Sequence, residues 1–321
     1  MPRAARGRRL LPTVAVLVCG CATNSDFLTG DPIESPLDAV ELEETPFFPQ
    51  TENLCGPAAL ATVLKQSGVE VGIDEARSAV YIPERKGSLQ LELVAAVRGY
   101  GRIPYQIDPS MAALIAELHA GRPVLILQNL GFKIAPMWHY AVVVGYLPQE
   151  RRVVLRSGDV ERYVISEAKF IRSWERADYW SVVVLRADEL PVVADESRYL
   201  KTVATLESMR QHDAALQAYQ TALRRWPTST LALLGLGNVH YARGDLAEAE
   251  SAYRDLLRRD PNHMIALNNL AQTLADRGCV REAVTTIDAA IDMSEMTHPL
   301  SPSLVATRNL LSVMPETACP N

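Results

Sequence analysis

Two folded units of different classes are predicted by this 321-residue sequence: an α+β domain over residues 47–190 and an all-helical array over residues 191–300. In the first unit, helical patterns come early and β-rich runs come late, which is typical of helices packed on an antiparallel sheet. In the second unit, small and apolar residues recur with a period of 34, which indicates stacked helical hairpins. The length also suits two domains of ordinary size.

The α+β domain is expected to contain three helices, over residues 56–65, 88–98 and 110–119. Pro57 occupies a tolerated first-turn position in the first helix. Ser88 and Ser110 are expected to cap the other two, and Gly121 follows the end of the last one. Four runs rich in β-branched and aromatic residues predict strands, over residues 123–127, 140–146, 153–155 and 180–185.

The helical array is indicated by residues that recur 34 positions apart. The small, turn-forming and helix-ending residues at this spacing are Ala215, Ala249 and Ala283, Gly244 and Gly278, and Pro227 and Pro261. The pattern resembles the tetratricopeptide repeat, with about three units over residues 196–229, 230–263 and 264–297, and a C-terminal tail over residues 301–321. Such arrays present a concave surface to a protein or peptide partner; the alternative is that this one only braces the first domain.

Composition excludes two broad classes of protein. Hydrophobic residues make up 48% and charged residues 22% of the chain, which is enough for a packed core. The formal net charge of −6 argues against nucleic acid as a partner, because phosphate binding requires a basic face. No apolar run reaches the roughly 18 residues that cross a bilayer, so an integral membrane protein is not expected.

The first 21 residues have the organisation of an export signal. A basic segment precedes a short apolar stretch over residues 10–18, which is too short for a transmembrane helix. The stretch ends in Val18-Cys19-Gly20-Cys21, which resembles the lipobox of bacterial lipoproteins. The resemblance implies that Cys21 is diacylated and becomes the N-terminus of the mature chain. The alternative is an ordinary cleaved signal, with Cys21 a stray thiol.

The residues that follow extend this interpretation. Ala22 after the cysteine implies, on the lipoprotein sorting rule, attachment to the outer membrane of a bacterial cell envelope, facing the periplasm. Residues 22–46 are rich in Asp, Glu, Pro, Ser and Thr and lack a hydrophobic period, so a flexible tether is expected. Acyl chains would supply the membrane affinity that an acidic chain lacks.

Three cysteines remain beyond the signal: Cys55, Cys279 and Cys319. No CxxC pair or Cys/His spacing typical of a zinc site occurs, so neither a metal nor an organic cofactor is expected. Cys279 and Cys319 could pair in an oxidising compartment, and the spacing leaves this open. Cys55 is then a lone thiol in an exported chain.

Cys55 lies at the start of the first predicted helix, which suits a nucleophile. Unpaired backbone N–H groups and the positive end of the helix dipole favour the thiolate over the thiol. Gln50 precedes it and could donate its side-chain amide to an oxyanion. Two histidines in this domain could act as the base: His119, expected to be exposed at the polar end of a helix, and His139, which opens a strand. His139 is the better partner for an activated thiol.

The order of these motifs resembles the papain-like double-glycine leader peptidases, the bacteriocin-processing family. The resemblance covers residues 47–190 and rests on the segments 50–59, 121–125 and 139–146. It implies a papain-like cysteine peptidase domain in which Cys55 is the nucleophile, His139 the base and Gln50 part of the oxyanion hole. Double-glycine specificity is not carried over, because family members usually face the cytoplasm and this chain is expected to be exported.

A third catalytic position has two candidates, because the family's Asn-Asp-Pro segment is replaced by Arg156-Ser157-Gly158-Asp159. A turn centred on Gln149 places Asp159 opposite His139, and a turn centred on Pro148 places Ser157 there instead. The family's local pattern favours the serine. Asp159 is chosen because a carboxylate both orients an imidazole and stabilises its cation.

These observations predict an exported, lipid-anchored thiol peptidase that cleaves peptide or amide bonds and uses its repeat array to bind a substrate or protein partner. Two other functions fit the same residues. A papain-like amidase or acyltransferase could act on cell-wall amides. A non-catalytic envelope assembly protein could use the array alone, with the first domain as a scaffold.

Overall fold

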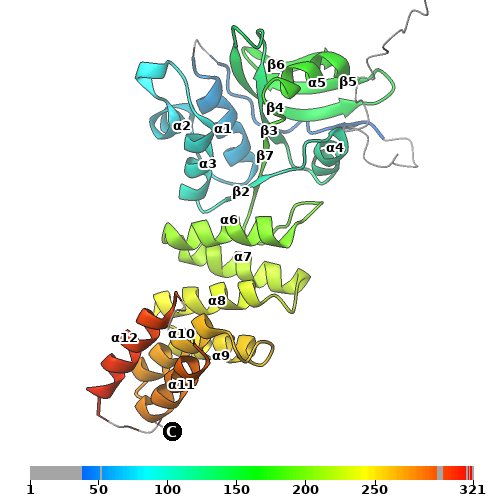
Figure 1. Ribbon diagram of the computed structural model, residues 1–321. Helices are drawn as coiled ribbons and strands as arrows, with labels where there is room; N and C mark the ends of the chain where they lie inside the picture. Colours follow the sequence, from blue (N-terminus) through cyan, green and yellow to red (C-terminus); the bar gives the residue numbers. More distant parts are fainter. Residues whose placement is uncertain (1–37, 51–52, 295–298, 316, 318, 320–321) are drawn as a thin grey trace, which may run out of the picture.

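The computed structural model describes residues 38–50, 53–294, 299–315, 317 and 319. An α+β domain leads directly into a column of antiparallel helices (Figure 1). The predicted signal segment and Cys21 lie outside the described residues. No helix in the described part of the chain is long and apolar enough to cross a membrane.

The α+β domain contains five α-helices among its described residues. They are α1 (Cys55–Gln66), α2 (Ile73–Val80), α3 (Gln90–Gly99), α4 (Met111–His119) and α5 (Glu167–Glu175), with a short 3-10 turn η1 (Pro83–Arg85). The strands are β1 (Val40–Glu41), β2 (Ile103–Gln106), β3 (Val124–Asn129), β4 (Trp138–Leu147), β5 (Arg152–Ser157), β6 (Val160–Ser166) and β7 (Ser181–Leu185).

The strands form one antiparallel sheet in the order β2-β7-β3-β4-β5-β6, with β1 paired to the far end of β4. Side chains alternate between its two faces. Val142 and Val144 of β4 pack with α1 on one face, whereas Val143 packs in the core that also contains side chains of α4 and α5 on the other. The predicted α+β class, with helices on an antiparallel sheet, is confirmed.

All three predicted helices and all four predicted strands of this domain are present. The Ser110 hydroxyl accepts a hydrogen bond from the Ala113 amide at 3.1 Å, as expected of a cap. Ser88 does not cap α3: the helix begins later, and the buried Ser88 hydroxyl has no hydrogen-bond partner among the described residues. The elements α2, α5, β2 and β6 were not predicted, because each is short, with between four and nine residues.

The tether predicted over residues 22–46 is wrong for residues 38–46, which belong to the domain. Val40 and Glu41 pair with Tyr146 and Gly145 of β4. The segment is also held by Arg156, which is 5% exposed and donates hydrogen bonds to the carbonyls of Glu43 and Thr45 at 2.7 and 3.1 Å. A buried guanidinium needs such acceptors, so it fixes the segment that carries them.

The repeat array consists of three helical hairpins followed by one more helix. The hairpins are α6 (Glu196–Ser208) with α7 (His212–Arg225), α8 (Thr230–Arg243) with α9 (Leu246–Leu257), and α10 (Met264–Asp276) with α11 (Val280–Met293). They coincide with the three units that the 34-residue period predicts. Ala215, Ala249 and Ala283 are fully buried, as expected of small residues where helices cross closely.

The first hairpin is built into the core of the α+β domain. Leu200 and Val203 of α6 belong to the same buried cluster as Ile103 of β2. Arg198 forms an ion pair with Asp108 at 2.8 Å. The array therefore braces the first domain through α6 and α7, while the later hairpins extend away from it (Figure 1).

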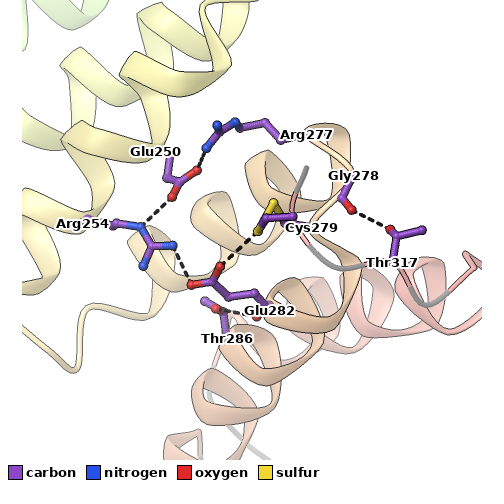
Figure 2. Close-up of a disulfide and its surroundings, with 9 residues drawn as sticks. Glu250, Arg254, Arg277, Gly278, Cys279, Glu282, Thr286 and Thr317 are labelled. Carbon is purple, nitrogen blue, oxygen red and sulfur yellow. Dashed lines mark hydrogen bonds and ion pairs between the residues drawn. A yellow bond between two sulfur atoms is a disulfide. The ribbon is translucent and has the colours of Figure 1, made fainter. Parts of the chain in front are cut away.

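The predicted C-terminal tail is wrong in part, because residues 301–312 form α12 (Ser301–Ser312). Leu304 and Leu311 of this helix are buried in the core of the last hairpin. A disulfide joins Cys279 to Cys319, which decides the pairing that the sequence left open (Figure 2). Helix α12 thus covers the apolar face of the last hairpin.

Removing this disulfide should lower the stability of the last hairpin. The bridge closes a loop with a sequence separation of 40 residues, so Cys279→Ser with Cys319→Ser should cost about 4 kcal/mol through the greater freedom of the unfolded chain. Hydrogen exchange of α11 and α12 measures the effect. Exchange that stays unchanged in these helices would contradict a stabilising role.

Candidate active site

Cys55 is the first residue of α1 and the free thiol among the described cysteines. The helix begins here because Asn53 adopts a positive φ of 67°, which asparagine tolerates, and Leu54 then provides the first helical carbonyl, bonded by the Ala58 amide. The amides of Cys55 and Gly56 precede the first intrahelical donor, so they are available to an anion. The thiol is half-buried beside these groups.

Gly56 brings a second segment close to the nucleophile. A Cβ atom on this residue would lie 2.5 Å from the Ser88 hydroxyl oxygen and 2.6 Å from its Cβ. Only glycine allows that approach, which places the loop before α3 against the start of α1.

A cleft of about 620 Å³ opens at this end of α1. Its lining includes four predicted site residues, Cys55, His139, Gln50 and Asp159. The structure therefore brings together, around one cavity, side chains from positions 50 to 159 of the sequence. Their catalytic roles stay predictions.

His139 is the second residue of β4, and its ring is held from one side. Its Nε2 atom lies 2.9 Å from the Ser157 hydroxyl oxygen. When Nε2 carries the proton and donates a hydrogen bond to that oxygen, Nδ1 is left unprotonated and can accept a proton. Burial lowers the pKa of His139 below its ordinary value of 6.5, which keeps the imidazole neutral at neutral pH. No hydrogen bond joins the ring to Cys55 among the described residues.

The predicted contact of Asp159 with this ring is wrong. Beyond a bulge, β4 and β5 pair Val142 with Arg156, the register expected for a turn centred on Gln149. However, β5 ends at Ser157, and the chain reverses at Gly158, where φ is 64°. Asp159 therefore lies exposed in the turn before β6, whereas the alternative, Ser157, contacts the ring.

Gln50 reaches the cleft on an extended segment rather than on a helix or strand. Its backbone amide donates a hydrogen bond to the Gly158 carbonyl at 3.0 Å. This contact ties the segment before α1 to the same turn that follows Ser157. The position suits the predicted oxyanion role, because the residue lines the cleft together with Cys55.

The other histidine of this domain is excluded as the base. His119 ends α4 and is exposed, as the sequence predicted. It is not among the residues that line the cleft.

Two further groups of cleft residues were not predicted. Arg85 and Lys86, which follow Pro83 in the η1 loop, line one wall. Trp138, the first residue of β4, also lines the cleft. In the loop between β3 and β4, Phe132 and Ile134 are 76% and 97% exposed. The apolar run over residues 130–138 was visible in the sequence, but its exposure was not.

Family comparisons agree with this architecture. Residues 42–182 match the Peptidase_C39 like family, and residues 205–262 and 234–295 match the tetratricopeptide repeat. The chain thus consists of a cysteine-peptidase-like domain and a repeat array. More narrowly, it carries a Peptidase_C39-like domain followed by C-terminal tetratricopeptide repeats, which confirms the resemblance drawn from the sequence.

Solved structures with a similar fold are distant in sequence. A C39-like peptidase from Bacillus anthracis is 17% identical, with a TM-score of 0.39, over 46% of this chain and 98% of its own. The Yersinia enterocolitica type III secretion chaperone SycD, in complex with a peptide of the translocator YopD, is 15% identical, with a TM-score of 0.35, over 36% of this chain and 92% of its own. No curated protein matches the sequence significantly.

Proposed function

We propose that this chain is a thiol peptidase that cleaves peptide or amide bonds by a Cys–His mechanism. One observation carries the proposal: Cys55 and His139 line the same cleft. Cys55 lies at the N-terminus of α1, and the ring of His139 is hydrogen-bonded to Ser157. A thiol beside helix N–H groups and a neutral imidazole are the two components of an activated nucleophile. The match of residues 42–182 to the Peptidase_C39 like family supports it.

In the proposed reaction, His139 accepts the Cys55 proton and the thiolate sulfur bonds to the carbonyl carbon of the substrate. The Gln50 side-chain amide and the Cys55 backbone N–H stabilise the resulting oxyanion. The C–N bond then breaks as His139 returns the proton to the leaving amine. Water, deprotonated by His139, hydrolyses the thioester, releases the acid and restores the thiol.

Ser157 acts in this scheme as a positioning residue. Its oxygen accepts a hydrogen bond from the protonated Nε2 atom of His139, which fixes both the orientation and the tautomer of the ring. A serine orients the ring but adds no negative charge, so it stabilises the imidazolium less than a carboxylate would. Asp159 lines the cleft and is not required for these steps.

The reactivity of Cys55 towards iodoacetamide should depend on His139. The imidazole accepts the thiol proton only when neutral, and burial lowers its pKa, so assistance should persist on acidification until the pH falls through a value below 6.5. His139→Ala should slow alkylation near pH 7 by roughly tenfold or more. It should also remove the fall in alkylation rate that protonation of His139 causes at acidic pH. The rate of alkylation from about pH 4 to 9 is the measurement.

His119→Ala is the matched control, because that histidine is exposed and lies away from the cleft. It should leave the profile unchanged. Equal alkylation in the native protein and in His139→Ala, or a thiol that reacts only after unfolding, would contradict the peptidase proposal.

We also propose that the repeat array binds a protein or peptide partner. A groove of about 830 Å³ lies between α6, α7 and α8, and its lining includes Tyr219 and Asn238. This role does not need the thiol, so Cys55→Ala should abolish cleavage and retain partner binding. An amidase would instead release an amine from the cell wall, and an acyltransferase would transfer the acyl group to an amine. Mass spectrometry of the products distinguishes these activities from peptide hydrolysis.

Export and lipid attachment at Cys21 complete the proposal and rest on the sequence. Labelling of cells with radioactive palmitate should mark the protein, and Cys21→Ser should remove the label. Fractionation of the labelled envelope then tests the expected outer-membrane location. Label retained in Cys21→Ser would contradict the anchor.

A further inference from the structure

A second cavity, of about 360 Å³, shares the His139 side chain with the Cys55 cleft. His139 and Gly158 line both cavities, so the two cavities adjoin at these residues. Leu130 and Ile165 are aliphatic residues in the lining of this second cavity and could contact an apolar group of a ligand. A ligand group held here would therefore lie directly next to the reacting bond.

The charged side chains of this cavity are all cationic. Lys169, Arg172 and Arg176 line it, and no Asp or Glu is among its lining residues. Their spacing of three and four places them on one face of α5 and its C-terminal cap, where like charges repel. An anion bound between them would relieve that repulsion.

None of the three cations has a carboxylate partner within the described residues, and Arg176 instead binds a backbone carbonyl. Lys169 and Arg172 are exposed and form no ion pair there. Helix α5 carries two acidic residues. Glu167 binds Arg151 at 2.8 Å and Tyr146 at 2.6 Å, and the exposed Glu175 is not among the residues that line the cavity.

The remaining wall of the cavity is held in place by hydrogen bonds. Arg176 donates to the Asn129 carbonyl at 2.7 and 3.1 Å, which fixes the guanidinium at the rim. Below it, the buried Gln128 amide donates to the Ser173 hydroxyl at 2.6 Å. The cavity is thus a formed pocket with one fixed and two adjustable cations, which suits a planar carboxylate.

We infer that this cavity is a subsite for a carboxylate of the substrate, within a few residues of the bond that Cys55 attacks. The carboxylate belongs either to an acidic side chain or to the C-terminus of the peptide. Leu130 and Ile165 would contact the apolar part of the same residue. This inference rests on the proposed function for the position of the bond, and on the cavity alone for the ligand chemistry.

Binding to the full chain with Cys55→Ala tests the subsite without turnover. The probes are fluorescein-labelled decapeptides that differ in a central residue, glutamate or glutamine, and in a C-terminal carboxylate or amide. Fluorescence anisotropy should show that one carboxylate improves affinity by roughly tenfold over the neutral peptide. The peptide pair that shows the difference identifies which carboxylate is bound.

The double variant Lys169→Glu with Arg172→Glu should erase that preference, because two exposed cations become anions. The matched control, Lys65→Glu with Arg281→Glu, makes the same charge change at exposed sites on α1 and α11 and should keep the preference within about twofold. Equal affinity for charged and neutral peptides, no binding up to about 1 mM, or a preference that survives the double variant would overturn the subsite.

Hydrolysis of the same peptides by the native chain separates the two proposals. A carboxylate preference in binding without any cleavage would overturn the peptidase and keep the subsite. Cleavage of charged and neutral peptides at equal kcat/KM would keep the peptidase and overturn the subsite.

Discussion

Replacing Cys55 with alanine is expected to lower kcat/KM for peptide hydrolysis at least about 1,000-fold, to the background of the solvent reaction. The reason is that the thiol forms the covalent intermediate, and no other described cysteine lies in the cleft. Cys55→Ser should be nearly as inactive, because a hydroxyl is a far weaker nucleophile than a thiol near neutral pH.

The measurement is initial rate against substrate concentration for both variants, with far-UV circular dichroism to show that the fold is retained. Cys279→Ser is the control cysteine variant: it should reduce stability and leave kcat/KM within about twofold, because the disulfide that it breaks lies in the array rather than at the cleft. Activity that survives in Cys55→Ala would place the nucleophile elsewhere.

Gly235→Ala is expected to destabilise the repeat array by about 3 kcal/mol. A Cβ atom on this residue of α8 would lie 2.5 Å from the Tyr219 hydroxyl oxygen and closer still to its ring carbons. Tyr219 is 2% exposed, and its hydroxyl donates to Glu207 at 2.8 Å, so the ring cannot move away without losing that bond. The added methyl group therefore has no space.

Guanidinium unfolding followed by circular dichroism measures this change. Gly99→Ala is the matched control, because a Cβ there meets nothing within 4 Å at the end of α3. That variant should be neutral or slightly stabilising, since alanine favours the helix. A Gly235→Ala protein as stable as Gly99→Ala would contradict the packing argument.

Local patterns in the sequence determined most of the elements of this protein. The spacing of Ala215, Ala249 and Ala283 was sufficient for the three hairpins, because each repeat packs only on its neighbours and so uses the same residues again. The start of α1 at Cys55 and the strand at His139 followed from short-range signals, and both residues line one cleft.

The sequence patterns did not predict the short elements. Helix α2 has only eight residues, which is shorter than the roughly 11–18 residues over which a helical period is recognised. The helix α12 covers the last hairpin through Leu304 and Leu311, but it falls outside the 34-residue period and was therefore expected to be a tail.

By itself, then, the sequence determined the fold class, the repeat architecture, and the candidate nucleophile and base. Only the tertiary structure decided that Ser157, rather than Asp159, contacts His139, because the chain reverses at Gly158 and the strand ends two residues before Asp159. It also decided that residues 38–46 join the sheet, because Arg156 needs their carbonyls once it is buried. Both outcomes depend on contacts between segments far apart in the chain, and local periodicity carries no information about them.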